Sequence, residues 1–134
     1  MATVTLRTPD TFEPYQPGGV IPMHEVISHA RRSGSHWFDP ATMRGFGSRV
    51  PNVATIGKDG RAWFVSSEQD RRYDGTAGAW NGERRYTIRA YNPATGQMDD
   101  GERLPGDRYD PDAFGRYRSL QTATAAMRRL LDRM

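Results

Sequence analysis

Three histidines are the first residues of this sequence to consider for chemistry, because imidazole binds metal ions and transfers protons near neutral pH. Two of them, His24 and His29, are five positions apart. On a helix this spacing separates them by about 140°, so they cannot bind one ion as an i, i+4 pair does. The third is His36, and the chain has no cysteine to complete a site. We predict exposed or capping histidines and no metal.

Serine and carboxylate side chains give no better case for catalysis. Ser66 and Ser67 precede Glu68, but no G-x-S-x-G elbow and no marked base accompany them. Polar residues at the end of a strand explain this stretch better. The acidic residues between positions 99 and 112 lack the spacing of a calcium loop, and no glycine-rich phosphate loop is present. We therefore predict that the protein is not an enzyme and uses no cofactor.

Arginine is the residue type that favours a ligand, because its planar guanidinium contacts phosphate and stacks on flat rings. Of the 19 basic residues only Lys58 is a lysine, a bias that a GC-rich genome also explains. Several acidic residues lie nearby, so an ordinary solvated face is the alternative. The candidate binding residues are interleaved arginines and aromatics: Arg61, Arg71, Arg72, Tyr73, Trp80, Arg84, Arg85, Arg89 and Tyr91.

Two runs, residues 61–68 and 84–91, are the densest in aromatic and β-branched side chains, so we predict that they are neighbouring strands. A third strand at residues 52–57 is expected to form a hairpin with the first run through a turn at residues 58–60. Alternation in the second run places Tyr86, Ile88 and Ala90 on a core face. The other face, predicted to be wet and cationic, carries Arg85, Thr87, Arg89 and Tyr91.

Periodic apolar residues predict helices that position these strands. Residues 20–32 have one apolar stripe of helical spacing, and residues 119–134 have a longer one that Ser119 is expected to cap. A short helix is expected to begin at Asp39 as N-cap, with Pro40 in its first turn. Gly34 is expected just past the end of the first helix.

These elements predict one α+β domain at residues 20–134, a two-layer sandwich in which an antiparallel three-stranded sheet is packed by a long C-terminal helix and two shorter N-terminal helices on one face. Residues 1–19 form an expected extended arm rich in Pro and Gly, and residues 3–6 within it are compatible with a fourth, edge strand. Long loops are expected at residues 69–83 and 97–116. The sequence does not fix the oligomeric state.

Hydropathy excludes a helical membrane protein, because no apolar run approaches the roughly 18 residues of a membrane span. The N-terminus also lacks the profile of a signal peptide. We therefore expect a cytoplasmic protein with no membrane partner.

Three strings of this sequence are distinctive as text: residues 36–44 (HWFDPATMR), 64–69 (FVSSEQ) and 85–89 (RYTIR). Together with Phe46, Ser48 and Arg49, they resemble a family of small uncharacterised proteins encoded by phages, prophages and plasmids of high-GC Gram-positive bacteria. The resemblance covers roughly residues 33–92 and implies a bacterial host cell, but it brings no known activity or catalytic residue. The length of the insertion at residues 70–83 departs from the usual pattern.

The leading hypothesis is a non-catalytic accessory protein of a phage or mobile element that binds a nucleic-acid backbone through the arginines of the sheet face and loop. The alternative is an inhibitor or adaptor that engages a host protein through the loop that contains Tyr73 and Trp80.

Overall fold

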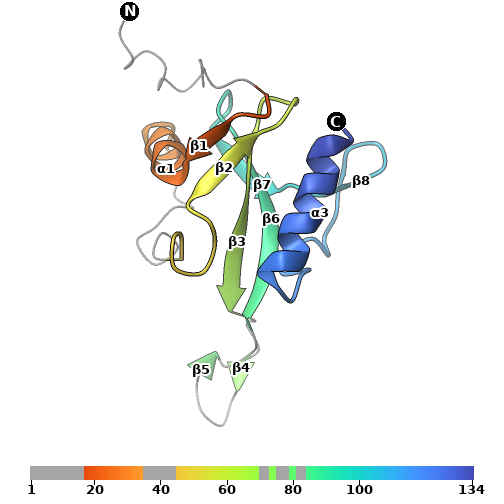
Figure 1. The fold of residues 1–134 in the computed structure, drawn as a ribbon. Helices are drawn as coiled ribbons and strands as arrows, with labels where there is room; N and C mark the ends of the chain where they lie inside the picture. Colours follow the sequence, from red (N-terminus) through yellow and green to blue (C-terminus); the bar gives the residue numbers. More distant parts are fainter. Residues whose placement is uncertain (1–16, 35–44, 70–72, 75–78, 81–83) are drawn as a thin grey trace, which may run out of the picture.

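A five-stranded antiparallel sheet forms the centre of the protein (Figure 1). The computed structural model describes residues 17–34, 45–69, 73–74, 79–80 and 84–134. In spatial order the strands are β1 (Val20–Pro22), β2 (Val53–Ile56), β3 (Ala62–Gln69), β6 (Arg84–Asn92) and β7 (Gln97–Asp100). The sheet therefore has more strands than the three predicted.

Strands β3 and β6 form the longest pair, with a register that runs from Ala62 opposite Tyr91 to Gln69 opposite Arg84. This pairing confirms the prediction that the two runs richest in aromatic and β-branched residues are neighbours. Beyond the ends of β3 and β6, Figure 1 shows a small hairpin of β4 (Tyr73–Asp74) and β5 (Ala79–Trp80).

The predicted hairpin between β2 and β3 is confirmed. The Gly57 amide donates to the carbonyl of Arg61 over 2.9 Å, and the Gly60 amide donates to the carbonyl of Gly57 over 3.0 Å. Gly60 has a φ of 81°, which an L side chain adopts only at a cost. The turn at residues 58–60 therefore sets the register in which Thr55 lies opposite Trp63.

Helix α3 (Leu120–Asp132) packs on one face of the sheet, as predicted. The Ser119 hydroxyl accepts a hydrogen bond from the Thr122 amide over 3.1 Å, so Ser119 is the N-cap. Below the helix lie Trp63 of β3 and Ile88 and Ala90 of β6. Ile88 and Ala90 belong to the face of β6 predicted to be core.

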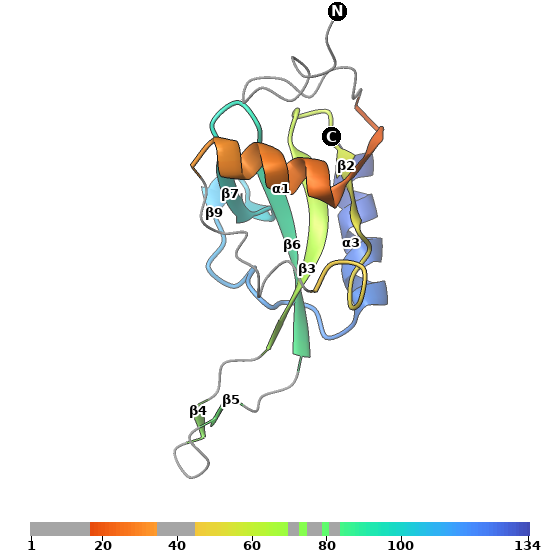
Figure 2. The same cartoon turned by 90° about the vertical axis from the view of Figure 1, so that its left-hand side faces the viewer.

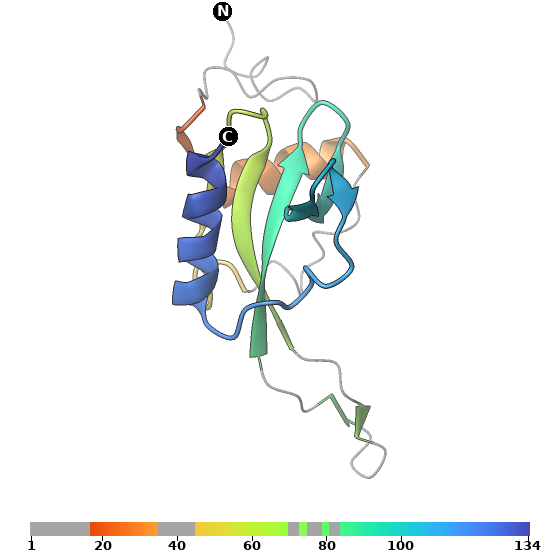
Figure 3. The same cartoon turned by 90° about the vertical axis from the view of Figure 1, so that its right-hand side faces the viewer.

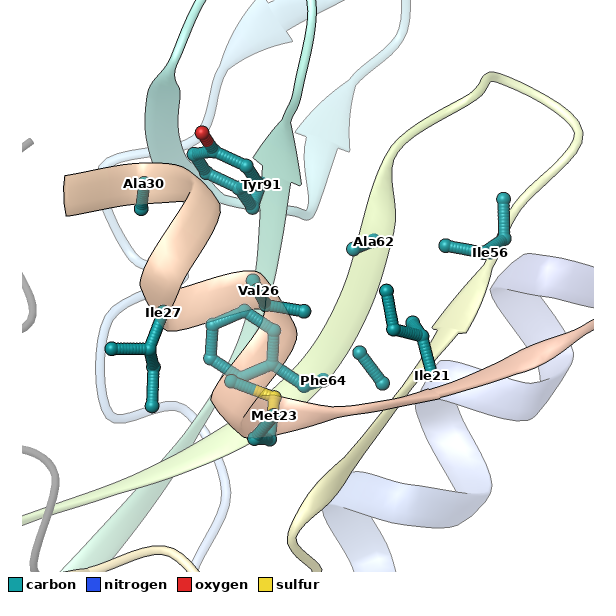
Figure 4. Close-up of a cluster of buried hydrophobic side chains, with 10 residues drawn as sticks. Ile21, Met23, Val26, Ile27, Ala30, Ile56, Ala62, Phe64 and Tyr91 are labelled. Atoms are coloured by element: carbon teal, nitrogen blue, oxygen red, sulfur yellow. The ribbon is translucent and has the colours of Figure 1, made fainter. Parts of the chain in front are cut away.

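Helix α1 (Met23–Arg32) lies on the opposite face, so the prediction that all helices pack on one face is wrong. Figures 2 and 3 show the sheet between α1 and α3. Met23, Val26 and Ala30 of α1 are fully buried, and Figure 4 shows them packed near Phe64 and Tyr91 of the sheet. The face of β6 predicted to be wet is covered where it meets α1.

The termini of α1 follow the expected local chemistry with one difference. The helix begins after Pro22, whose φ of −61° and ψ of 143° are extended, so residues 20–22 pair as β1 instead of starting the helix. Gly34 has a φ of 88° directly after the C-cap Ser33, which confirms its predicted place.

The region predicted to be an irregular loop at residues 97–116 contains three strands. β7 extends the sheet beside β6, and β8 (Arg103–Leu104) pairs with β9 (Arg108–Tyr109) in a separate hairpin. The short helix expected at Asp39 and the strand considered at residues 3–6 lie outside the described residues. Within the described part of the chain, α1 and α3 are the two helices.

Candidate functional site

Arg89 is buried in a cluster of polar side chains and does not face solvent. It is 7% exposed, its guanidinium forms ion pairs with Asp100 and, over 3.2 Å, with Glu68, and its Nε donates to the Ser66 hydroxyl over 3.1 Å. Asp100 is the residue of β7 directly opposite Arg89. The predicted cationic position is therefore neutralised by a strand that the sequence did not predict.

Glu68 connects this cluster to the segment before α3. Its carboxylate accepts from Ser66 over 2.5 Å and from Thr87 over 2.8 Å, and the Thr87 hydroxyl in turn accepts from the Gly115 amide over 2.7 Å. The Ser66 hydroxyl thus both donates to a carboxylate and accepts from Arg89. A hydroxyl held in this way favours a structural role over that of a nucleophile.

The remaining sheet arginines also have protein partners. Arg61 forms ion pairs with Asp59 over 2.8 Å and Asp99 over 3.5 Å, and its guanidinium carbon lies 5.1 Å from the centre of the Trp63 ring. Arg84 donates to Ser67 over 3.0 Å, and Arg85 donates to a main-chain carbonyl over 3.2 Å. These side chains hold the β3–β6 pair and its surroundings together, and they do not form one open cationic patch.

Tyr91, another predicted binding residue, is fully buried under α1. Its hydroxyl lies 2.7 Å from Nδ1 of His29 and 3.4 Å from the Ser33 hydroxyl. Burial raises the pKa of Tyr91 above the ordinary value for tyrosine.

The prediction of exposed or capping histidines is wrong for His29, which is fully buried because α1 lies on the sheet face that was expected to be open. It is correct for the exposed His24, and His36 lies outside the described residues.

The predicted loop residues are only in part described. Tyr73 in β4 lies directly opposite Trp80 in β5, so the fold brings these two aromatics into register. Arg71 and Arg72 lie outside the described residues.

A second polar cluster fixes the segment between β7 and α3. Arg116 forms ion pairs with Asp110 and, over 3.1 Å, with Glu102, while the Tyr117 hydroxyl donates to Glu102 over 2.7 Å. Burial, together with the hydrogen bond and negative charge of Glu102, raises the pKa of Tyr117 to about 12. The hydrogen bond from Arg116 lowers the pKa of the Asp110 carboxyl.

The outer side of α3 carries arginines that the sequence reading did not select. Arg128, Arg129 and Arg133 are exposed, and Asp132 is the only acidic residue in the sequence of the helix. Among the described residues, no ion pair holds any of these three arginines. In the sequence, their position beside and opposite the apolar stripe of residues 119–134 was the available signal.

A groove of about 620 Å³ lies beside α3, between the helix and the β1–β2 edge of the sheet. We call it the α3 groove. Two of its residues, Val20 and Val53, are 59% and 44% exposed, although both are β-branched and apolar. Its lining residues are Pro17, Gly18, Val20, Pro51, Val53, Thr55, Ile56, Gly57, Lys58, Phe64, Val65, Thr124, Met127, Arg128, Leu131 and Asp132.

In the described part of the chain, no helix is long and apolar enough to cross a membrane, and no group of three or more histidine and carboxylate side chains could hold a metal ion.

Comparisons with known proteins add a family and no activity. No curated protein and no solved structure matches the sequence. The model of a family of unknown function, DUF7447, matches residues 23–128, from the first residue of α1 to the second half of α3. The chain therefore belongs to this family, whose members have no assigned function.

Proposed function

We propose that this protein is a non-catalytic accessory protein of a phage or plasmid, and that it binds a nucleic-acid backbone through the outer side of α3. One observation carries the proposal: Arg129 and the C-cap residue Arg133 are exposed at the end of a helix with a single acidic residue. The sheet face is a poorer candidate, because Arg61 and Arg89 are already paired with carboxylates. Arg84 and Arg85 also donate to oxygens of the protein.

The spacing of these arginines suits a phosphate backbone. A helix rises about 1.5 Å per residue, so Arg129 and Arg133 lie roughly 6 Å apart along its axis. One strand of a duplex carries one negative charge per roughly 3.4 Å of its axis, so a separation of this size lets the two side chains contact about two phosphates of the same strand. Contacts of this kind give affinity without sequence preference.

The test is binding to a fluorescein-labelled DNA duplex of random sequence, followed by anisotropy as salt is raised. The wild-type protein is expected to bind at low salt and to lose affinity steeply, because binding releases counterions. Reversing charge at both Arg129 and Arg133 with glutamate is expected to reduce the salt slope by about 2, since each phosphate contact contributes about 0.9.

The matched control reverses two exposed charges outside α3, at Arg49 and Arg108, so that net charge changes equally. If this control weakens binding as much as the α3 variant, the attraction is a property of net charge and the proposed surface is wrong. Absence of any complex with duplex or single strand at low salt contradicts the function itself.

The β4–β5 hairpin favours the alternative, an inhibitor or adaptor that binds a host protein. Its register places Tyr73 opposite Trp80, and aromatic residues frequently anchor protein interfaces. On this alternative, Trp80→Ala abolishes binding of a host protein and the affinity depends little on salt, whereas charge reversal on α3 has no effect.

A further inference from the structure

The strand register leaves part of one sheet face uncovered. Val20 lies opposite Thr55, and Thr55 lies opposite Trp63, so the three side chains form one row across the face that α3 packs on. Helix α3 covers Trp63, which is 2% exposed, but not Val20, which is 59% exposed. Figure 3 shows α3 in front of the β1–β2 side of this face, and the α3 groove lies between the helix and these two strands.

The second exposed valine belongs to the same surface. Val53 is two residues from Thr55 in β2, so it points to the same face, and it is 44% exposed. Met127 and Leu131 of α3 form the facing wall of the α3 groove. A volume of about 620 Å³ is enough for several side chains of a bound segment, as ligand sites of roughly 300–1,000 Å³ are typical.

Charged residues line the groove unequally. Lys58 and Arg128 are both exposed and line it, and Asp132 is the only acidic residue among the lining residues. An occupant that carries carboxylates beside its apolar side chains complements this arrangement, because opposite charges give both attraction and selectivity. A nucleic acid fits the groove less well, because its charged phosphates gain nothing from contact with the apolar side chains that line the groove.

We propose that the α3 groove binds an acidic, amphipathic segment of a partner protein. Apolar side chains of that segment pack on Val20, Val53 and Leu131, while its carboxylates meet Lys58 and Arg128. Arg129 and Arg133, which carry the proposed nucleic-acid contact, do not line the groove. The two surfaces lie on different flanks of α3, so the two proposals can fail independently.

The experiment selects peptides from a random display library on the full-length wild-type protein and on the charge-reversed variant Lys58→Glu/Arg128→Glu. Wild type is expected to enrich apolar peptides with Asp and Glu, and the charge-reversed variant is expected to enrich apolar peptides with Lys and Arg. Affinity of a wild-type-selected peptide is expected to fall by about tenfold or more in Val53→Asp, which removes apolar contact and adds repulsion.

Val53→Thr is the second variant, because it retains a β-branched side chain and strand propensity and is expected to weaken the peptide to a smaller extent. Circular dichroism verifies that both variants fold. The control Arg129→Glu/Arg133→Glu is expected to bind the peptide as wild type does, and Val53→Asp is expected to retain DNA binding.

Four results would overturn the proposal. The first is that the wild-type protein enriches no peptides, and the second is that the wild-type protein and the charge-reversed variant enrich the same peptides. The third is that both Val53 variants bind the selected peptide with the affinity of wild type. The fourth is that the full chain binds the peptide only when Phe12 and Tyr15 are replaced by serine. The last result would assign the groove to this chain's own N-terminal segment.

Discussion

Gly101 shows how closely single residues are fitted in this protein. It follows β7, its amide donates to the carbonyl of Ile88 over 2.9 Å, and a methyl group on it would lie 3.0 Å from Cε3 of the buried Trp63 and closer still to Cζ3. We expect Gly101→Ala to lower the free energy of unfolding by about 1–3 kcal/mol, because a rigid ring and a hydrogen-bonded backbone cannot both move away. Urea denaturation measures this change.

The companion measurement repeats the substitution in a Trp63→Leu background, where the ring is absent. There Gly101→Ala is expected to cost much less. An equal cost in both backgrounds would show that the overlap with Trp63 is not the cause.

Tyr117 links stability to alkaline pH. Its pKa is raised to about 12 in the folded protein, against an ordinary value near 10, so the folded state favours the neutral phenol. The stabilisation is complete below pH 10 and is lost as pH rises from about 10 through 12. We expect Tyr117→Phe to be less stable at neutral pH, because it loses the hydrogen bond to Glu102, and to show a shallower decline across that window.

Urea midpoints measured at intervals from pH 8 to pH 12 provide the test. Tyr91 also has a raised pKa and remains in the variant, so part of the decline should persist. Tyr109→Phe, which changes a tyrosine that is 59% exposed, serves as the control and should follow the wild-type curve. A Tyr117→Phe curve parallel to wild type would contradict the linkage.

Local chemistry could predict which way a side chain points but not what covers it. The alternation in β6 correctly separated Ile88 and Ala90 from Arg89 and Tyr91. The prediction that the second face of β6 is exposed was wrong. The burial of this face depends on α1 and on Asp100 of β7, and a local sequence pattern shows neither contact. Of the candidate binding residues, Tyr73 and Trp80 lie opposite each other in the β4–β5 pair.

At the scale of the element, the N-cap of α3 gives a measurable prediction. Ser119→Ala removes the acceptor for the Thr122 amide and is expected to cost about 1 kcal/mol, within the range of roughly 0.5–2 for such caps. Chemical denaturation of Ser119→Ala tests it, and Ser119→Asp, which retains an acceptor and suits the positive end of the helix dipole, should be close to wild type. Equal losses in both variants would show that the cap contributes little.

The elements with strong periodicity were predictable, and those held by pairing alone were not. The stripe in α3 and the runs in β3 and β6 carry their own signal. β7 has the sequence Gln-Met-Asp-Asp, without any β-branched residue, and it forms a strand by pairing with the edge of β6 that β3 does not use. Pro22 suited the first turn of a helix equally well, but pairing with Val53 makes it the end of β1.

At the scale of the whole molecule, one sheet is shared by two helices on opposite faces. Loss of packing between α1 and the sheet should therefore also destabilise the packing between α3 and the sheet. Met23→Ala creates a cavity in the α1 core and is expected to cost about 2–5 kcal/mol. We expect the same unfolding midpoint from far-ultraviolet circular dichroism and from Trp63 fluorescence, which reports on the α3 face.

The fluorescence experiment uses a background in which Trp37 and Trp80 are replaced by phenylalanine, so that Trp63 is the only tryptophan. In this background, Met23→Ala should shift both signals together. Two separate midpoints would show that the faces unfold independently and that the sheet does not couple them.

The two outer strands also have a consequence for the protein in concentrated solution. β1 is three residues long and ends at Pro22, which has no amide hydrogen to offer, while β7 carries Asp99 and Asp100. A strand from a neighbouring molecule would find few donors at the β1 border. At the β7 border it would meet carboxylates that are already held in ion pairs with Arg61, Arg89 and Arg103. Growth of fibres by edge-to-edge pairing of such sheets is therefore disfavoured at the β1 border.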